Sequence, residues 1–325
     1  MENNNLKEIV KTSDNTDTYK TPLKEDGGDI ISNNGISESP FLLENKQQYK
    51  AWRAEKLSRY PVNLESFIVP IDSLDRITPV EKDAILDRCK NYNMAIYQLN
   101  NPQCDPELLK AFASNFGLEN LDQHFCNDNN GITALRVSSE NNKGGFIPYS
   151  DKAISWHTDG YYNSVEQQVY AILLHCHTPA SEGGENYVMD HEMAYISLRD
   201  ENPAYIKALM HEDAMTIPAH IEEGKLLREE QSGPVFSVHK NGKRLHMRFS
   251  QRKRYITWRD DSILKEAILF LNHLLNTDKR DMLHIKLKKG QGILCNNILH
   301  NRSAFKDTEK QSRLIYRGRF FDPIV

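Results

Sequence analysis

The chain has 325 residues, 41 basic and 45 acidic side chains, and a formal charge of −4. This balance gives no basic surface of the kind that nucleic-acid-binding proteins carry, so no nucleic-acid partner is expected. There is no apolar span long enough to cross a membrane, and the first residues lack the apolar core of a signal peptide, so no membrane partner is expected either.

The first 40 residues are rich in Asn, Ser, Asp, Thr and Gly and contain few large apolar groups. Such a segment buries too little surface to offset the entropy of ordering, so residues 1–40 are predicted to form a disordered polar tail. Residues 41–325 are predicted to form a single domain, because this length fits one catalytic domain with a helical N-terminal part and inserted segments.

Helices are predicted at six places after the tail. Thr78 can cap a helix, Pro79 suits its first turn and Glu81 completes a capping box. Another helix carries an apolar stripe at helical spacing, which indicates core packing. The expected helices cover residues 45–58, a segment opening at 78, a segment opening at 105, and residues 192–200, 203–212 and 262–275.

Strand-like segments lie between these helices, and Asn241-Gly242 splits one of them in the manner of a hairpin turn. The segments are 94–99, 132–138, 167–177, 185–189, 234–250, 282–288, 292–296 and 313–321. Strands and helices do not alternate regularly, which argues against a doubly wound parallel sheet. The pattern predicts a mainly β protein of the α+β class, with an antiparallel core and helices outside it.

Three residues are candidate metal ligands: His157, Asp159 and the distant His300. In an extended strand, residues i and i+2 point to the same side, so His157 and Asp159 can bind one ion together. Two imidazoles and one carboxylate leave coordination positions open, as in non-haem Fe(II) oxygenases. A second His-x-Asp pattern begins at His211, but His211 closes an apolar helical segment, so the pattern at His157 is favoured.

The C-terminal strand-like segment places Arg313, Arg317 and Arg319 on one face. A solvated face is the plain alternative. If the face looks into the core, each guanidinium needs an anionic partner, because an unpaired buried charge costs several kcal/mol, on the order-of-magnitude scale for ions. A dicarboxylic cosubstrate can supply such a partner, since the planar guanidinium binds a carboxylate through two parallel hydrogen bonds.

Together, the run Trp156 to Gly160, the run Gly183-Gly184-Glu185-Asn186, His300 and the run Arg313 to Arg317 resemble the taurine dioxygenase (TauD/TfdA) superfamily over about residues 94–322. The resemblance implies a double-stranded β-helix, or jelly-roll, core with flanking helices. It implies that Fe(II) is bound by His157, Asp159 and His300, and that Arg313 binds the distal carboxylate of 2-oxoglutarate. Asn186 stands where the family often has Thr or Ser, and its amide can donate a similar hydrogen bond.

The resemblance also implies the reaction. Oxidative decarboxylation of 2-oxoglutarate by O2 gives succinate and CO2 and is coupled to oxidation of a substrate C–H bond. A carboxylate at Asp159 favours hydroxylation over halogenation, whereas desaturation and ring formation stay open. The expected substrate is a small polar metabolite, anionic or amino-acid-like, and its candidate contacts are Arg317, Tyr161, Tyr162 and Arg248. Residues 139–152 and 221–233 are long enough to act as lids.

Other interpretations stay open. His175 and His177 share a strand face and could bind zinc, but no further ligand stands at zinc-like spacing. Five cysteines are dispersed along the chain, and this odd number predicts a reducing compartment and a cytoplasmic location. The alternatives to a 2-oxoglutarate dioxygenase are a cupin-like metal enzyme that needs no 2-oxoglutarate and a non-catalytic jelly-roll binding protein.

Overall fold

The folded unit begins earlier than the sequence predicts. The structure, a computed structural model, describes residues 34–61, 63–123, 131–138, 146–222, 224–252, 255–277 and 279–325. Residues 34–40, predicted to belong to the polar tail, contain helix α1 (Asn34–Ser37) and the buried Ser39. Arg199 donates a hydrogen bond of 2.9 Å to the carbonyl of Pro40, which attaches this segment to the rest of the unit Asn34–Val325. Residues 1–33 lie outside the described residues.

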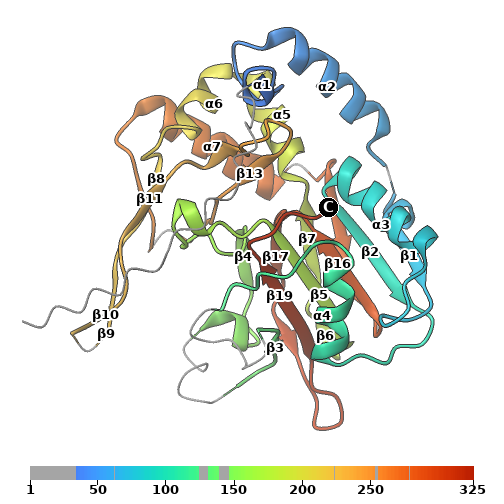
Figure 1. Cartoon of the computed structure of the whole chain (residues 1–325). Helices are drawn as coiled ribbons and strands as arrows, with labels where there is room; N and C mark the ends of the chain where they lie inside the picture. Colours follow the sequence, from blue (N-terminus) through green and yellow to red (C-terminus); the bar gives the residue numbers. More distant parts are fainter. Residues whose placement is uncertain are drawn as a thin grey trace, which may run out of the picture. The chain divides into compact units, whose positions relative to one another are not determined.

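Two sheets form the centre of the fold (Figure 1). Six strands are ordered β1-β2-β16-β5-β19-β3, and four are ordered β15-β7-β17-β4. All neighbouring pairs in these sheets are antiparallel except β1 and β2, which are parallel. The strands are β1 (Ile68–Ile71), β2 (Met94–Leu99), β3 (Thr133–Leu135), β4 (Ile154–His157), β5 (Ala171–Thr178), β7 (Asn186–Met189), β15 (Met282–Ile285), β16 (Gln291–Cys295), β17 (Leu299–Arg302) and β19 (Leu314–Phe320).

Alternation along β5 shows how the layers are built. Ile172 and Cys176 are buried in a cluster with Val188 of β7, so they lie between the two sheets. Leu173 is buried in a different cluster, with Phe112 of α4 (Pro106–Ser114), so it faces the helices. Both faces of the strand are therefore covered, and the predicted antiparallel β core with helices outside it is confirmed.

The helix α3 (Pro79–Tyr92) also covers this face of the six-stranded sheet (Figure 1). Its predicted capping box is present. The Thr78 hydroxyl accepts a hydrogen bond from the Glu81 amide, and the Glu81 carboxylate accepts one of 2.7 Å from the Thr78 amide. Thr78 and Glu81 thus satisfy amides that the first helical turn leaves free.

A third apolar cluster joins the remaining helices to short strands. The predicted stripe on α7 (Ser262–Thr277) is buried there, and the Asn241-Gly242 hairpin is confirmed as the antiparallel pair β12 and β13. None of the described helices is long and apolar enough to cross a membrane. The elements are α2 (Lys46–Arg59), α5 (His191–Glu201), α6 (Pro203–Leu209), β8 (Met215–Ile217), β11 (Gln231–Gly233), β12 (Phe236–Val238), β13 (Leu245–Met247) and β14 (Thr257–Trp258).

Several short elements were not predicted. Among them, β4 and β17 carry or adjoin the candidate metal ligands, and β9 (His220–Glu222) and β10 (Lys225–Arg228) form a hairpin that projects from β8 and β11 (Figure 1). Strands of two to four residues show too little alternation for their sequence to predict them. The others are α1, β1, β8, β11, β14, β6 (Glu182–Gly183), β18 (Phe305–Lys306), η1 (Leu64–Phe67), η2 (Ile147–Tyr149) and η3 (Val165–Gln167).

Candidate active site

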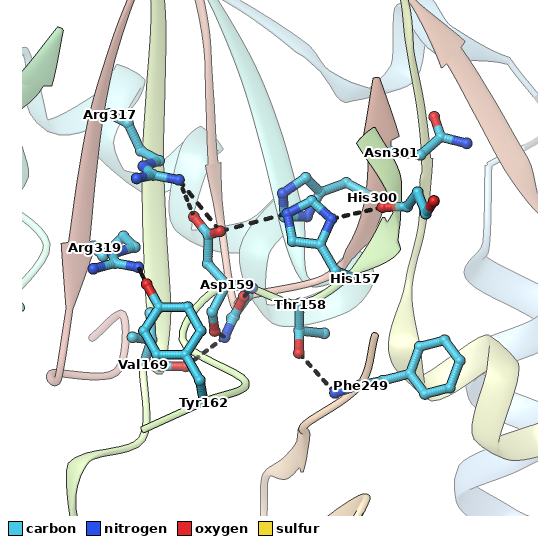
Figure 2. Close-up of polar contacts among 12 residues, drawn as sticks. His157, Thr158, Asp159, Tyr162, Val169, Phe249, His300, Asn301, Arg317 and Arg319 are labelled. Carbon is cyan, nitrogen blue, oxygen red and sulfur yellow. Dashed lines mark hydrogen bonds and ion pairs between the residues drawn. The ribbon is translucent and has the colours of Figure 1, made fainter. Parts of the chain in front are cut away.

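The structure brings the three candidate metal ligands together (Figure 2). His157 ends β4 and pairs with His300 on β17, which places the two ring centroids 4.3 Å apart. Asp159 follows two residues later, with its Oδ1 3.6 Å from Nε2 of His157. One ligand atom from each residue lies within 4.8 Å of the others, and the described residues contain no second cluster of this kind.

Both histidines present the same ring nitrogen to the cluster. Nδ1 of His157 lies 2.9 Å from the carbonyl of Ser155, and Nδ1 of His300 lies 2.9 Å from the carbonyl of Ile298. Because a carbonyl only accepts hydrogen bonds, each Nδ1 carries the proton and each Nε2 keeps its lone pair. Burial also lowers the pKa of His300 to about 4, so its ring is neutral at pH 7. Two imidazoles and a carboxylate form a donor set that suits Fe(II).

Asp159 is positioned by Asn297 rather than by strand geometry. β4 ends at His157, so the two-residue spacing predicted from an extended strand is only part of the explanation. The Asp159 amide donates to Oδ1 of Asn297 at 2.8 Å, and Nδ2 of Asn297 donates to the Asp159 carbonyl at 2.9 Å. Gly160 then turns the chain with φ +66°, where an added Cβ would lie 2.4 Å from Cγ2 of Val169.

The arginine face of β19 looks into the core, not into solvent. Arg313, Arg317 and Arg319 are only 6%, 8% and 3% exposed. Nη1 of Arg317 lies 3.3 Å from Oδ2 of Asp159. Burial by itself raises the pKa of a carboxyl group, but Arg317 and His157 hold the pKa of Asp159 well below its ordinary value. The carboxylate is therefore ionised, as a metal ligand must be.

Arg319 extends this network on the side of Asp159 away from the histidines (Figure 2). Its Nη1 donates a hydrogen bond of 2.6 Å to the Tyr162 hydroxyl, and its Nη2 lies 2.8 Å from Oδ2 of Asp122. Two of the three arginines are thus paired with acidic groups. Sequence reasoning did not identify Asp122 or Asn297 as parts of the site, although Asn296-Asn297 is a turn signal of the kind that precedes a sharp change of direction.

Arg313 differs from its neighbours on the strand. Among the described residues, no acceptor receives a hydrogen bond from its guanidinium, and Nη1 is buried without a partner. Burial lowers the pKa of Arg313 to about 10, so the group still carries a positive charge at pH 7. It lines a small cavity together with Asn186, Gly184 and Cys176. A buried cation without an anion, facing a cavity, fits a carboxylate ligand.

The cavity depends on the Gly183-Gly184 pair. Both residues have left-handed backbone conformations, with φ +69° and +73°, and a Cβ on Gly183 would lie 2.2 Å from the carbonyl oxygen of Ala304. Asn186 follows on β7 and donates from its side-chain amide to the carbonyl of Asn301 on the neighbouring strand. One amide N–H of Asn186 is thus engaged by β17, while the side chain lines the same cavity as Arg313.

Comparison with known proteins agrees with this geometry. Residues 70–318 match the family described as Taurine catabolism dioxygenase TauD, TfdA family. The chain belongs to this family. It is an Fe(II)- and 2-oxoglutarate-dependent oxygenase, which excludes the alternatives of a cupin-like enzyme that needs no 2-oxoglutarate and of a non-catalytic binding protein.

Several proteins of known name are similar to this chain. A uridine-5'-phosphate dioxygenase of Streptomyces sp. is 24% identical over 194 residues, which cover 56% of this chain and 68% of the relative. The structure of AAD-2 with Mn(II) and N-oxalylglycine matches with a TM-score of 0.58 at 16% identity, over 82% of this chain and 98% of that one. A taurine dioxygenase from Burkholderia xenovorans matches with a TM-score of 0.51 at 17% identity, over 78% and 86%. These structures confirm the predicted jelly-roll fold.

Arg248 was predicted to contact the substrate. Its guanidinium donates hydrogen bonds to main-chain carbonyls instead. Nε donates to the carbonyl of Tyr161 at 2.7 Å, and Nη2 donates to Gln231 at 2.9 Å. Nη1 donates to Met215 at 2.8 Å and to Gly233 at 3.4 Å. Four of its five N–H groups are therefore occupied, so Arg248 connects the loop after Asp159 to β8 and β11 instead of presenting free donors to a ligand.

The predicted lids are only partly described. Residues 139–145 and 223 lie outside the described residues. The remainder of the first lid is attached to the core, because Arg302 donates to the carbonyls of Ser150 and Lys152 at 2.7 and 2.6 Å. The second lid contains the β9–β10 hairpin.

The weaker metal candidates do not join the site. His211 forms a surface pair with Asp213, with Nδ1 2.5 Å from Oδ1, and no third ligand joins them among the described residues. His175 is buried on the helix-facing side of β5, where its Nδ1 lies 3.0 Å from the Tyr97 hydroxyl. Burial lowers the pKa of His175 to about 4. The favoured choice of His157 over His211 agrees with the geometry.

Proposed function

We propose that this family member hydroxylates a C–H bond of a small anionic metabolite and releases succinate and CO2, and that one catalytic domain carries the activity. The observation that supports the proposal is the convergence of His157, Asp159 and His300 beside a strand face of buried arginines. The site thus combines a donor set for iron with cationic groups that can hold a diacid and an anionic substrate.

The proposed roles follow from what each side chain leaves free. Nε2 of His157, Nε2 of His300 and the Asp159 carboxylate hold Fe(II), since both Nδ1 atoms are already bound to carbonyls. Arg313 holds the distal carboxylate of 2-oxoglutarate, with Asn186 as a further donor in the same cavity. When bound, Fe(II) and 2-oxoglutarate supply the oxidising chemistry with O2. Protein side chains alone cannot carry out this chemistry.

The protein contributes placement and charge. Asn297 fixes the loop that carries Asp159, and Arg317 holds the Asp159 carboxylate ionised. Because Asp159 supplies a protein carboxylate to the metal, the site favours transfer of a hydroxyl group over transfer of a halide. Nε of Arg317 is buried without a hydrogen-bond partner among the described residues, so Arg317 can also turn a donor towards an anionic substrate.

The substrate is proposed to be anionic. Tyr161 and Tyr162 follow Asp159 and Gly160 in the chain, and the Tyr162 hydroxyl lies within hydrogen-bond distance of Arg319. Tyr162, Arg319 and Arg317 are phenolic and cationic groups on the Asp159 side of the three metal ligands (Figure 2). The Streptomyces relative is named for a phosphorylated nucleoside, which supports a phosphorylated metabolite as the first class of substrate to test.

Succinate release under air tests this function. Full-length protein with Fe(II), ascorbate and 2-oxoglutarate is incubated with a panel of nucleoside monophosphates, sugar phosphates, sulfonates and amino acids. We expect one class of anion to raise succinate release above the rate without substrate. The reaction is then repeated in 18O2, where hydroxylation predicts one labelled oxygen in the product and one in succinate.

The second His-x-Asp pattern of the chain provides a matched control for the succinate assay. His211→Ala removes a surface histidine of that pattern and is expected to leave substrate-stimulated succinate release unchanged, whereas His157→Ala abolishes it. Succinate release without 18O in the product contradicts hydroxylation. Stimulation only by neutral molecules contradicts an anionic substrate.

A further inference from the structure

The β9–β10 hairpin carries an arginine that neither the metal site nor the 2-oxoglutarate cavity uses. Arg228 is the last residue of β10, where the hairpin joins the body of the protein. Its Nη2 donates a hydrogen bond of 2.7 Å to the carbonyl of Pro218, while its Nε is buried without a hydrogen-bond partner. Among the described residues, no carboxylate forms an ion pair with Arg228.

The base of the hairpin is fixed to the loop that follows Asp159. Arg248 binds the carbonyls of Gln231 and Gly233 on β11 and the carbonyl of Tyr161 in that loop. Arg228 precedes Gln231 by three residues, so the same contacts hold it near the loop. Burial and the neighbouring Arg228 lower the pKa of Arg248 to about 10, in agreement with two guanidinium groups placed close together.

Tyr162 lies near a second pair of cations. The guanidinium carbon of Arg228 is 5.6 Å from the centroid of the Tyr162 ring, and that of Arg319 is 5.8 Å from the same centroid. The Tyr162 hydroxyl accepts a hydrogen bond from Arg319, so its own O–H remains able to donate to a further group. Two guanidinium groups thus lie against the phenol of Tyr162, in the loop that follows Asp159.

The positive charges near Tyr162 are not all paired with carboxylates of the described residues. Arg319 is paired with Asp122, and Arg317, two residues earlier on β19, is paired with Asp159. Arg228 has no such partner among the described residues and is half-buried. A partly buried guanidinium without an anion is unfavourable unless a ligand supplies one.

We propose that Arg228 and Tyr162 form the subsite for a dianionic phosphomonoester group of the substrate, so that Arg228 determines specificity for phosphorylated over singly charged molecules. This proposal rests on the proposed function and adds a residue from the hairpin to it. A phosphomonoester carries nearly two negative charges at pH 7 and offers three acceptor oxygens, which matches the free donors of Arg228 and the phenol. A sulfonate or carboxylate has a single charge, so its attraction to the Arg228 guanidinium is weaker than that of a phosphomonoester.

Binding of minimal anions to the full-length protein tests the subsite without turnover. Methyl phosphate and methyl sulfate have the same size and differ by one charge, and the broadening of their methyl proton signals in NMR measures binding of either. We expect the wild type to bind methyl phosphate more tightly than methyl sulfate. Arg228→Gln should weaken methyl phosphate binding about tenfold or more, because one charge-assisted contact is lost.

Further variants separate loss of the contact from loss of structure. Arg228→Lys keeps the charge and should recover part of the affinity, and Tyr162→Phe should weaken methyl phosphate by a smaller factor. Arg76→Gln changes an arginine whose side chain is 85% exposed and should bind like the wild type. Circular dichroism melting of each variant shows whether it is folded.

Two results overturn the subsite. One is equal binding of methyl phosphate by Arg228→Gln and the wild type, and the other is no preference of the wild type for methyl phosphate over methyl sulfate. Because binding is measured without iron and 2-oxoglutarate, it is independent of turnover. Absence of succinate release with every substrate contradicts the proposed function and leaves this binding result standing.

Discussion

Arg302 and Arg313 both lie close to the ring of Phe305, but their guanidinium groups have different partners. Each guanidinium carbon is 5.0 Å from the centroid of Phe305, and each side chain is buried. Arg302 donates to the carbonyls of Pro148, Ser150 and Lys152, at 3.3, 2.7 and 2.6 Å. Arg313 donates from its guanidinium to none of the described residues and faces a cavity.

The difference separates arginines that hold the fold from arginines that await a ligand. A guanidinium bound to several main-chain carbonyls stabilises the segments it connects, and Arg248 belongs with Arg302 in this group. A buried guanidinium with free N–H groups weakens the free protein and gains its partner on binding. Arg313 belongs to this second group.

The largest expected effect comes from substitution of a metal ligand. His300→Ala removes one of the three donor atoms, and we expect substrate-dependent succinate release to fall to background because iron is no longer held. Iron content after dialysis and succinate release measure the effect. An active, iron-loaded His300→Ala enzyme would contradict the assignment.

Arg313→Ala tests the arginine that awaits a ligand. We expect the affinity for 2-oxoglutarate to fall roughly 10- to 100-fold, since charge-assisted contacts to its carboxylate are lost. The free energy of unfolding without 2-oxoglutarate should stay unchanged or rise, because a buried charge without a partner is removed. Calorimetric titration of 2-oxoglutarate and urea unfolding give the two quantities.

Arg302→Ala is the matched control, at the same distance from Phe305. It leaves three carbonyls without their donor, so we expect a loss of about 1–3 kcal/mol in the free energy of unfolding. At a temperature where the variant is folded, its affinity for 2-oxoglutarate should change much less than that of Arg313→Ala. If Arg302→Ala and Arg313→Ala changed the free energy of unfolding and the affinity for 2-oxoglutarate equally, the two arginines would not have different roles.

Arg248→Met extends the comparison to the loop after Asp159. The carbonyls of Tyr161, Met215 and Gln231 lose a donor, and we expect a loss of about 1–3 kcal/mol in the free energy of unfolding. Urea unfolding measures it. A variant that is as stable as the wild type but has a raised KM for substrate would instead show Arg248 to be a direct substrate contact.

The smallest expected effect is in the carboxylate of Asp322, which follows the arginine strand β19. Asp322 accepts hydrogen bonds from the amide of Glu119 at 2.7 Å and the side chain of Asn120 at 2.8 Å. Burial raises the pKa of Asp322, but these bonds together lower it below the ordinary value. A lowered folded-state pKa contributes stability above the unfolded-state pKa, and this contribution is lost as pH falls through the folded-state value.

Asp322→Asn is therefore expected to lower the free energy of unfolding on the order of 0.5–1 kcal/mol near neutral pH, after screening by solvent. The difference from the wild type should shrink as the pH falls below about 4. Urea unfolding at a series of pH values checks this. A difference that grows towards acid pH would contradict the sign.

Much of the scaffold follows from local sequence, because short-range patterns determine it. The capping box at Thr78 and Glu81, the apolar stripe of α7 and the Asn241-Gly242 turn each specify their element within a few residues. The strand β17 was not predicted, although it carries His300, since four residues show no reliable alternation. Its place is set by pairing with β4 and β7, which are distant in the sequence.

The site shows the same limit. The spacing of His157 and Asp159 indicates a shared ion, but the contact that orients Asp159 comes from Asn297, 138 residues away. The sequence does not reveal whether the guanidinium of an arginine will donate hydrogen bonds to main-chain carbonyls. For this reason Arg248 was predicted as a substrate contact and Arg228 was not identified. Only the folded chain shows which guanidinium groups have free donors.

The most direct test of the central claim is an anaerobic titration of 2-oxoglutarate into the Fe(II)-loaded full-length protein, followed by visible absorption. Joint binding of iron and cosubstrate at His157, Asp159 and His300 predicts a weak charge-transfer band. With one iron bound per chain, the band should stop growing once each iron has bound one 2-oxoglutarate. The band should be absent in His300→Ala and should require more 2-oxoglutarate in Arg313→Ala. Iron that binds without giving the band, or a band that persists unchanged in His300→Ala, would contradict the account.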